Sequence, residues 1–591
     1  MKRIFLAFTV ITLLLTVTGC QKEVEKDPII VVNCDLFPER EECQDDVIID
    51  DNYCELNDDL CIEEIEVLLS EMTINEKVGQ MVQAERGSIS ANDVKQYNIG
   101  SILSGGGSHP SNYMNSVDEW YNMYKNFQEG ALASSSGIPL IYGIDAVHGN
   151  NNVYGATIFP HNIGLGAAND PDLMYRIGVA TAEEIKVTGI TWTFAPALSV
   201  VQNIKWGRTY EGFSENPLIH ENLTAQTILG LQQYGVSATA KHYLGDGGTY
   251  NGIDQGNVTL SEELIRTLHL APYYEAIAAG VDTIMISYSS INGIKMHGSH
   301  YWISDVLKDE LGFEGFIISD WNAIHQLPGD YDAQVVASVN AGVDMLMEPS
   351  DWRNTINSLL KAVEDGDITE ARINDAVRRI LMVKYERGLF DDPLGRLAEA
   401  DYFATEEHQE LAREAVRKSL VLLKNENNVL PLDKSENVYL VGPGANNVGY
   451  LCGGWTTYWQ GNENSDIGVG TSILTAFERE LTANGASVVN NLSEADTVVV
   501  VLTEKPYSEG VGDNQTLTLI DGNSHPDNIL ALNIAIQAHN EGKTVIGILV
   551  SGRPLLITEY LPYFEGFVAA WLPGTEGGNG VSDVVFGDYN F

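Results

Sequence analysis

Short apolar runs alternate with longer amphipathic stretches between about residues 100 and 350. The runs that predict strands are Pro139–Gly143, Thr191–Ala195, Ser237–Ala240, Thr283–Ser287, Gly315–Ser319 and Val343–Met347. Three of the intervening stretches have the helical spacing of apolar residues, namely Pro171–Val187, Ser261–Ala279 and Ala333–Ala341. Strands that alternate with helices predict parallel βαβ units, and the span fits a (β/α)8 barrel better than an open sheet.

Helical spacing also marks the two ends of this region. One helix begins near Ile62, and a long helix, Glu370–Arg387, ends at Gly388 ahead of a turn-rich segment that starts at Asp391. A further helix is predicted at about 407–424. We therefore expect the barrel domain to occupy residues 62–395 and a linker helix to occupy residues 396–430.

A second alternation of strands and helices follows. The buried-strand candidates are Val438–Val441, Thr497–Leu502, Thr544–Val550 and Phe567–Ala570, with helices at 472–484 and 526–541. The pattern predicts an α/β sandwich domain with a mostly parallel sheet at residues 431–591. Because the chain stops at Phe591 shortly after a predicted helix, without a terminal strand, we expect this domain to be truncated.

The N-terminus has the features of an export signal. Met1-Lys2-Arg3 is basic, and the apolar run that follows is too short to span a membrane permanently. Val17-Thr18-Gly19-Cys20 resembles a bacterial lipobox, which implies cleavage before Cys20 and lipid on its sulfur. A plain signal peptide is the alternative. We expect residues 1–20 to be the signal peptide of an exported lipoprotein in the periplasm or at the cell surface, anchored most readily in an outer membrane.

Residues 21–61 are polar, acidic and aperiodic, and predict a tether. In an exported protein, two disulfides among its cysteines are plausible, and the three pairings stay open. A metal cluster is disfavoured because no histidine is nearby and Cys-x2-Cys spacing is absent. The cysteines concerned are Cys34, Cys43, Cys54 and Cys61.

The whole chain is strongly acidic, with 34 Lys and Arg against 82 Asp and Glu and a formal net charge of −48. Such a surface repels nucleic acid and anionic lipid. We therefore expect no nucleic-acid partner, contact with a membrane only through the N-terminal lipid, and a substrate that is neutral or cationic. The oligomeric state does not follow from the sequence.

Polar residues come directly after the predicted barrel strands, at the end where active sites of such barrels lie. They are Asp145, Lys241-His242, Tyr288 and Asp320-Trp321, joined by Trp206-Gly207-Arg208 and Glu211 from another loop. The sequence has no phosphate loop, His-Glu-x-x-His motif or Gly-x-Ser-x-Gly elbow, and we expect neither cofactor nor metal. Carboxylates beside tryptophans suit carbohydrate chemistry, because a carboxylate attacks an anomeric carbon while an indole packs on a sugar face.

An ordered set of segments resembles glycoside hydrolase family 3, the family of β-glucosidases and β-glucan exohydrolases. The segments are Tyr142–Gly149, Ala156–Pro160, Trp206–Arg208, Lys241–Gly248, Ser287–Ser289, Ile318–Trp321 and Cys452–Trp455. They occur in family order and cover roughly residues 62–591. The resemblance implies a barrel followed by an α/β sandwich, with the substrate pocket between them.

The resemblance also implies roles for particular residues. Asp320 matches the nucleophile that forms a covalent glycosyl-enzyme, and Glu509 lies where the general acid/base is carried by the second domain. Retaining glycosidases hold these two carboxyl groups about 5–5.5 Å apart, so the two domains should dock closely. The expected substrate-binding residues are Asp145, Arg208, Lys241 and His242 for the hydroxyl groups, Tyr288 beside the nucleophile, and Trp321, Trp455 and Trp459 around the next sugar.

The predicted function is that of an exo-acting retaining β-glucosidase, which releases glucose from non-reducing ends of neutral β-glucans or oligosaccharides. β-Xylosidase activity is a close alternative, since the two substrates differ by one hydroxymethyl group. A transglycosylase shares every residue named, and a catalytically inactive glycan-binding lipoprotein also stays open. A β-N-acetylglucosaminidase is disfavoured, because Lys241–Asp246 is followed by no second histidine and because a second domain is present.

Two positions depart from the plant exohydrolases of the family. Gln255 stands where those enzymes have Glu, and Gln326 stands where they have Arg. Both positions are expected to border the substrate slot, so linkage preference is in doubt more than the reaction.

Overall fold

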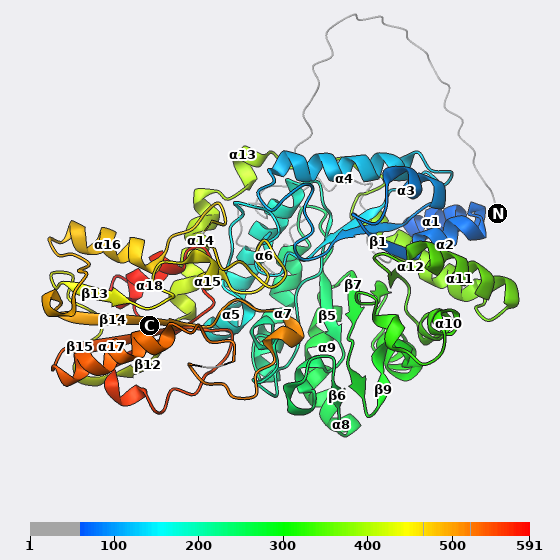
Figure 1. Ribbon diagram of the computed structural model, residues 1–591. Coiled ribbons are helices and arrows are strands. Elements are labelled where there is room, and N and C mark those ends of the chain that lie inside the picture. The colour runs from blue at the N-terminus through cyan, green and yellow to red at the C-terminus, as the bar shows by residue number, and fades with distance from the viewer. Residues whose placement is uncertain (1–58, 465, 521) are drawn as a thin grey trace, which may run out of the picture.

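A computed structural model of the chain describes residues 59–464, 466–520 and 522–591. These residues form two α/β domains that lie side by side (Figure 1). The predicted signal peptide with Cys20 and the tether with Cys34, Cys43 and Cys54 lie outside the described residues, as does the side chain of Cys61. No helix within the described ranges has the length and apolar character needed to cross a membrane.

Eight parallel strands close into a barrel in the first domain. Two arcs of hydrogen-bonded strands are joined by the parallel pairs Trp192 with Ser237 and Ile318 with Met345. The predicted (β/α)8 barrel is therefore confirmed. In order around the ring the strands are β1 (Val82–Glu85), β2 (Ser101–Ser104), β3 (Ile141–Ile144), β4 (Trp192–Thr193), β5 (Thr239–Tyr243), β7 (Thr283–Ile286), β10 (Phe316–Ile318) and β11 (Leu346–Met347).

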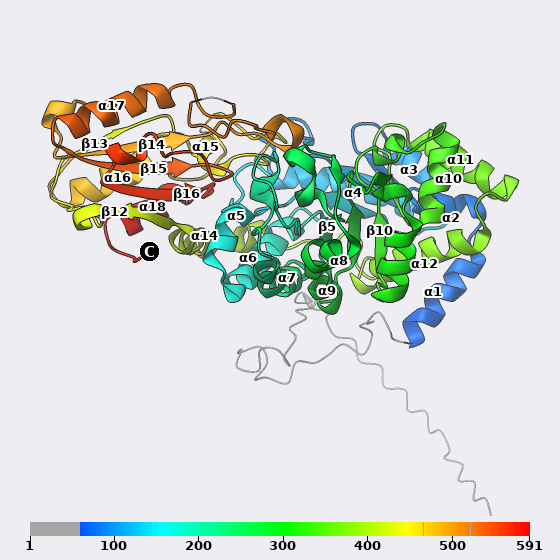
Figure 2. The same cartoon turned by 90° about the horizontal axis from the view of Figure 1, so that it is seen from below.

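Helices surround the strands on the outside of the barrel (Figures 1 and 2). Local signals fix their ends: Asp170 caps the helix that begins at Pro171, and Gly342, in the left-handed region, ends the helix that begins at Tyr331. The helices are α1 (Asp59–Glu71), α2 (Ile74–Gln80), α3 (Ala91–Tyr97), α4 (Val117–Leu132), α5 (Asn162–Ala168), α6 (Pro171–Lys186), α7 (Pro217–Leu231), α8 (Glu262–Leu264), α9 (Ala271–Ala278), a π-helix (Tyr301–Glu310), α10 (Tyr331–Ala341), α11 (Trp352–Asp365) and α12 (Glu370–Glu386).

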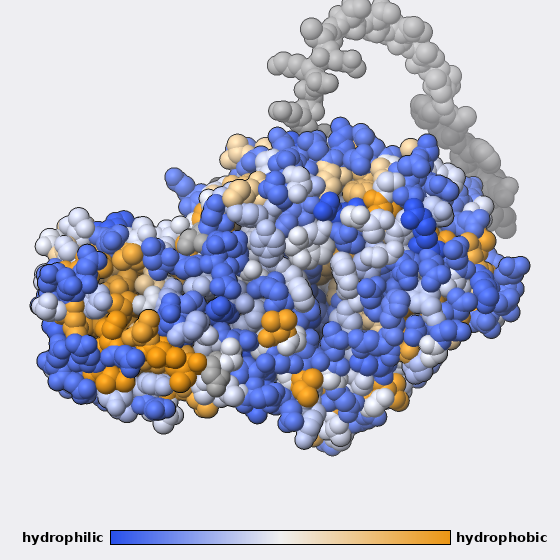
Figure 3. Space-filling model, in the orientation of Figure 1, coloured by the Kyte–Doolittle hydropathy of each residue, from blue (hydrophilic) through white to orange (hydrophobic). Residues whose placement is uncertain are grey.

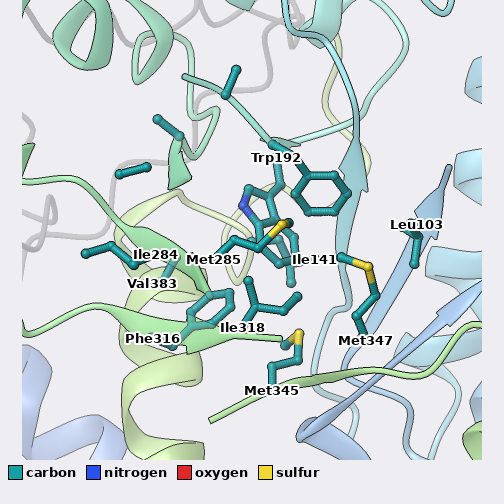
Figure 4. Packing of buried hydrophobic residues seen from close by; sticks show 14 of the residues in the cluster. Leu103, Ile141, Trp192, Ile284, Met285, Phe316, Ile318, Met345, Met347 and Val383 are labelled. Atoms are coloured by element: carbon teal, nitrogen blue, oxygen red, sulfur yellow. The ribbon is translucent and has the colours of Figure 1, made fainter. Parts of the chain in front are cut away.

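Large side chains fill the inside of the barrel (Figure 4). Trp192 is fully buried at its centre, where its indole meets the rings of Phe194 and Phe316 edge to face. Its Nε1 donates hydrogen bonds to the hydroxyl oxygens of Thr239, at 2.8 Å, and Thr283, at 3.1 Å. The polar end of this buried ring is therefore satisfied, and the packed interior forms a rigid floor below the strand ends.

The second domain is built on a five-stranded sheet in the order β12-β16-β15-β14-β13, in which only the β12–β16 pairing is antiparallel. The strands are β12 (Val421–Asn425), β13 (Val438–Val441), β14 (Thr497–Thr503), β15 (Thr544–Val550) and β16 (Gly566–Trp571). Helix α17 (Asn528–Asn540) covers one face, and α16 (Ile473–Ala483) and α18 (Gly577–Val585) cover the other (Figure 2). Alternate residues of β14 enter two separate cores, with Val499 and Val501 on one face and Val498 and Val500 on the other.

The helix predicted at 407–424 is too long. The structure ends α14 (Glu406–Ser419) five residues earlier, and Val421 begins the edge strand β12. The run Leu420-Val-Leu-Leu423 continues the apolar character of the helix, so its spacing alone does not mark the change to a strand. The first strand of the second sheet thus lies inside the segment 396–430 that was expected to be a linker. Helix α14 itself packs on α5 and α6 of the barrel and on α18 of the second domain.

The surface of the barrel domain is mostly hydrophilic, as the excess of acidic residues leads one to expect (Figure 3). Apolar residues gather more densely on the second domain in the same view. Leu530 and Leu556 are among those that are well exposed there.

Candidate active site

A cavity of about 620 Å³ lies at the carboxyl ends of the barrel strands and extends to the second domain. All ten residues that the sequence predicted for catalysis and substrate binding line it: Asp145, Arg208, Lys241, His242, Tyr288, Asp320, Trp321, Trp455, Trp459 and Glu509. The barrel strands and their loops supply the first seven, and the second domain supplies the last three. The two domains therefore build one site, as the separation of Asp320 and Glu509 in sequence requires.

Asp320 lies two residues after the end of β10 and has one free oxygen in this site. Its backbone N–H donates to Nε2 of His297 at 3.1 Å, and its Oδ1 accepts the N–H of Trp321 at 2.7 Å. Its Oδ2 is buried and has no hydrogen bond to any described residue. Burial raises the pKa of this carboxyl to about 6, against the opposing effect of Arg208. The carboxyl group is thus held in place through Oδ1, while Oδ2 is free to act as a nucleophile.

Glu509 lies on a turn of the second domain and is half-buried. Its Oε1 is 3.6 Å from Nη1 of Arg208, which is the strongest opposing charge near it. The pKa of Glu509 is nevertheless raised to about 7, mainly by burial and also by the nearby carboxylates of Asp254 and Asp320. A carboxyl group with such a pKa carries a proton near neutral pH and can donate it.

A buried chain of hydrogen bonds supports the floor of the site. Arg208 donates to both oxygens of Glu211 at 2.9 Å, and its Nη2 lies 3.2 Å from Nε2 of His242. The other ring nitrogen of His242 lies 2.8 Å from Oδ2 of Asp246. Burial, with Arg208 and Lys241 close by, holds the pKa of His242 well below its usual range. The histidine is therefore neutral, donates from Nδ1 to Asp246 and accepts from Arg208.

Asp145 and Lys241 form a second polar pair in the cavity. Nζ of Lys241 donates to Oδ1 of Asp145 at 3.4 Å and lies 5.9 Å from the ring centroid of Trp455. Burial raises the pKa of Asp145, and the charge of Lys241 acts in the opposite direction. A carboxylate beside an ammonium group offers both acceptors and donors, which suits the hydroxyl groups of a sugar.

Trp321 and Trp459 form the exposed aromatic part of the site, with 38% and 37% of their surfaces accessible. The backbone of the glycine segment 105–107 lies against the tryptophans: a Cβ on Gly105 would come within 2.7 Å of the Trp321 ring, and a Cβ on Gly106 within 2.6 Å of the Trp455 ring and 3.0 Å of the Trp459 Cβ. The absence of side chains on this segment thus gives the rings their space. Trp455 is buried, and its Nε1 donates to Oε1 of Glu211 at 3.1 Å.

Tyr288 lines the cavity, whereas Gln255 and Gln326, which were expected to border the substrate slot, are not among its lining residues. The hydroxyl of Tyr288 donates to the carbonyl of Trp321, the residue after Asp320. Gln255 and Gln326, the two departures from the plant enzymes, contact each other: Nε2 of Gln326 donates to Oε1 of Gln255 at 2.8 Å. The two glutamines thus form a neutral, hydrogen-bonded pair.

The structure adds residues that the sequence did not identify. Glu85 and Arg86 line the cavity from the end of β1, and Nε of Arg86 donates to the hydroxyl of Ser108 at 2.9 Å. The sequence analysis did not find these two residues because it did not predict β1. The available sign was the charged pair itself, shortly after the short apolar run Met81-Val82. Glu211 was noticed on the loop of Arg208 but was given no role, and it now joins Arg208 to Trp455.

A single cavity with two carboxyl groups of raised pKa, polar pairs and exposed tryptophans defines a carbohydrate-processing enzyme of the carboxylate type. Within the described parts of the chain, no group of three or more His, Cys, Asp or Glu is arranged to hold a metal ion. The glycosyl hydrolase family 3 N-terminal domain matches residues 73–383, and the C-terminal domain of that family matches residues 420–591. The chain belongs to glycosyl hydrolase family 3.

Known relatives are similar over most of the chain. A lysosomal beta glucosidase of Dictyostelium discoideum is 34% identical, over 89% of this chain and 70% of its own length. The crystal structure of an exo-1,3/1,4-beta-glucanase from a Pseudoalteromonas species is 41% identical with a TM-score of 0.85, over 89% of this chain and 68% of that one. A beta-xylosidase of Formosa agariphila is 30% identical, over 78% of this chain and 69% of its own length.

Proposed function

We propose that the protein is an exo-acting, retaining β-glucosidase that removes glucose from the non-reducing ends of β-glucans or oligosaccharides. The observation that carries this proposal is the shared cavity of Asp320 and Glu509, in which one carboxyl has a free oxygen and the other has a pKa raised to about 7. The named β-glucosidase and exo-β-glucanase relatives support glucose as the sugar. The exposed tryptophan faces in the cavity fit a neutral sugar substrate.

In the first step, Oδ2 of Asp320 attacks the anomeric carbon while Glu509 gives its proton to the leaving oxygen. The bond to the aglycone breaks, and a covalent glycosyl-enzyme forms on Asp320. Forming this ester removes the negative charge of Asp320, which is one of the groups that raise the pKa of Glu509. The pKa of Glu509 therefore falls in the intermediate, and its carboxylate accepts a proton from water in the second step.

The sugar-binding groups act in both steps. Arg208, fixed by Glu211, and the pair of Asp145 and Lys241 offer fixed hydrogen-bond partners to the hydroxyl groups of the terminal sugar. Because these side chains are buried and paired before substrate arrives, they lose little freedom on binding. Trp321 and Trp459 provide flat apolar faces for the sugar on the leaving-group side.

A β-xylosidase is the second candidate, favoured by the relative of that name.

The decisive experiment compares hydrolysis of the 4-nitrophenyl β-glucoside and β-xyloside by the wild-type protein, Asp320→Asn and Glu509→Gln. We expect higher kcat/KM on the glucoside, a loss of at least about 10³-fold in Asp320→Asn, and recovery of Glu509→Gln by azide on an activated glucoside. Azide replaces water as the nucleophile of the second step without needing a base.

Two results would reject the proposal. A higher kcat/KM on the xyloside would favour the β-xylosidase. A protein that binds glucose but hydrolyses neither compound would be a glycan-binding protein instead. Transglycosylation is distinguished by the products, since a transglycosylase yields elongated oligosaccharides at substrate concentrations where a hydrolase yields free glucose.

We also propose that the protein is exported and held at a membrane surface by lipid on Cys20. The basic start, the short apolar run and the lipobox-like Val17-Thr18-Gly19-Cys20 support this proposal. When the full chain is expressed in a bacterium that processes lipoproteins, we expect it to partition into the detergent phase of a Triton X-114 extract. Cys20→Ala should move it to the aqueous phase with unchanged specific activity. Partition of both proteins into the aqueous phase would contradict the anchor.

A further inference from the structure

The turn that carries Glu509 rests directly on a barrel loop, residues 204–208. The N–H of Gly207 donates to Oδ1 of Asp513 at 2.9 Å, and the N–H of Asn514 donates to the carbonyl of Lys205 at 2.9 Å. A Cβ on Gly207 would lie 1.8 Å from the carbonyl oxygen of Glu509. The two backbones are therefore in contact with no side chain between them, and the same barrel loop carries Arg208.

One side chain binds both backbones at this contact. Arg553 follows β15 in the second domain and is fully buried. Its Nη1 lies 3.2–3.3 Å from three barrel carbonyls, those of Ile204, Lys205 and Trp206. Its Nη2 donates to the carbonyl of Gly512, on the Glu509 turn, at 2.7 Å. The guanidinium group thus joins the loop of Arg208 to the turn of Glu509.

The guanidinium group is itself held in one orientation. Its Nε donates to the hydroxyl of Tyr507 at 2.8 Å, and its carbon lies 4.6 Å from the centroid of the same ring. The Tyr507 hydroxyl in turn donates to Oε2 of Glu504 at 2.9 Å, and Glu504 lies 3.4 Å from Arg553. Tyr507 is two residues before Glu509, so this network orients the turn from a second side.

We propose that Arg553 is a positioning residue for the acid/base step: it sets the place of the Glu509 carboxyl over the substrate by fixing the Glu509 turn to the barrel backbone. The inference rests on the proposed function, in which Glu509 donates the proton. Arg553 does not line the cavity and acts only through the turn. The fixed planar fork of arginine, with its five N–H groups, matches this set of acceptors, whereas the ammonium group of lysine does not.

This role predicts a loss confined to the proton transfer. A displacement of about 1 Å in a catalytic group can cost about 10²-fold in rate. The loss should appear only where the leaving group needs a proton. For Arg553→Lys we therefore expect kcat/KM for phenyl β-glucoside to fall about 10²-fold, while that for 2,4-dinitrophenyl β-glucoside changes less than about threefold, because dinitrophenolate leaves without protonation.

The matched control is Arg372→Lys. Arg372 also binds two backbone carbonyls, those of Val339 and Val343, and a carboxylate, Asp344, but it lies away from the cavity. Its replacement should reduce thermal stability without changing the ratio of the two kcat/KM values. Asp513→Asn serves as a second test variant, since it weakens the same contact from the other side and should shift the ratio in the same direction as Arg553→Lys.

The results distinguish a failure of the proposed function from a failure of the positioning role of Arg553. Wild-type protein that is inactive on both glucosides would remove the proposed function. An active wild type whose Arg553→Lys and Asp513→Asn variants fold, by circular dichroism, and lose both activities equally would overturn the positioning role alone. If Arg553→Lys does not fold, an unchanged ratio in Asp513→Asn would likewise overturn it.

Discussion

Burial dominates the chemistry of the two reactive carboxyl groups. It raises the pKa of Asp320 to about 6 and that of Glu509 to about 7, although Arg208 opposes both shifts. The proposed mechanism needs the two groups in opposite protonation states, because in it Asp320 attacks as a carboxylate and Glu509 donates as an acid. The side chain of Asp320 is 12% exposed and that of Glu509 is 24% exposed, so the two carboxyl groups differ little in exposure.

These shifts predict a narrow bell-shaped pH profile of kcat/KM. Activity should fall below about pH 6, as Asp320 becomes protonated, and above about pH 7, as Glu509 loses its proton. The two apparent values belong to the coupled pair. The measurement is the pH dependence of kcat/KM on 4-nitrophenyl β-glucoside.

The variant Glu509→Gln identifies the alkaline limb. On the same 4-nitrophenyl β-glucoside, the residual activity of this variant should keep the acidic limb and lose the alkaline one. An alkaline limb that survives in Glu509→Gln would show that another group titrates there, and Glu509 would not be the acid.

At the scale of elements, the sequence predicted most readily the strands that form unbroken runs of apolar and β-branched residues. Thr544–Val550 has the predicted bounds, and Thr497–Thr503 differs by one residue, because runs of β-branched residues mark a central parallel strand clearly. Strands β1 and β2 were not predicted: each has four residues, and polar side chains such as Gln83 and Ser101 lie inside the barrel, hydrogen-bonded to each other at 2.8 Å. A buried polar pair interrupts the apolar pattern that sequence reasoning depends on.

Site residues were likewise found from the sequence where the strand before them was clearly marked. The residues after well-marked strands, such as Asp145 after β3 and Asp320 after β10, were found from the sequence. The resemblance to the family supplied Glu509, which no pattern of strands would have indicated. Arg553 was not found by either route, because its contacts are with backbone carbonyls distant in sequence, and such contacts leave no trace in residue spacing.

At the scale of the whole molecule, the cavity depends on the docking of two domains. The barrel presents Asp320, Arg208 and the pair of Asp145 and Lys241, and the second domain adds Glu509, the proposed proton donor, and two tryptophans. Buried histidine contacts also join the two domains: His161 is 2.7 Å from the carbonyl of Gly454, and His148 is 3.1 Å from that of Trp455. The two imidazole rings stack at 3.7 Å, and burial lowers the pKa of both, so the contact is uncharged at neutral pH.

The central claim is that Asp320 forms a covalent bond to glucose within this two-domain cavity. The most direct test is to treat the full protein with 2,4-dinitrophenyl 2-deoxy-2-fluoro-β-glucoside, whose fluorine slows the second step, and to locate the adduct by peptide mass spectrometry. We predict one fluoroglucosyl group per chain, on the peptide that holds Asp320, and none in Asp320→Asn. An adduct on a different residue, or an active enzyme that forms no adduct and releases glucose of inverted configuration, would contradict the account.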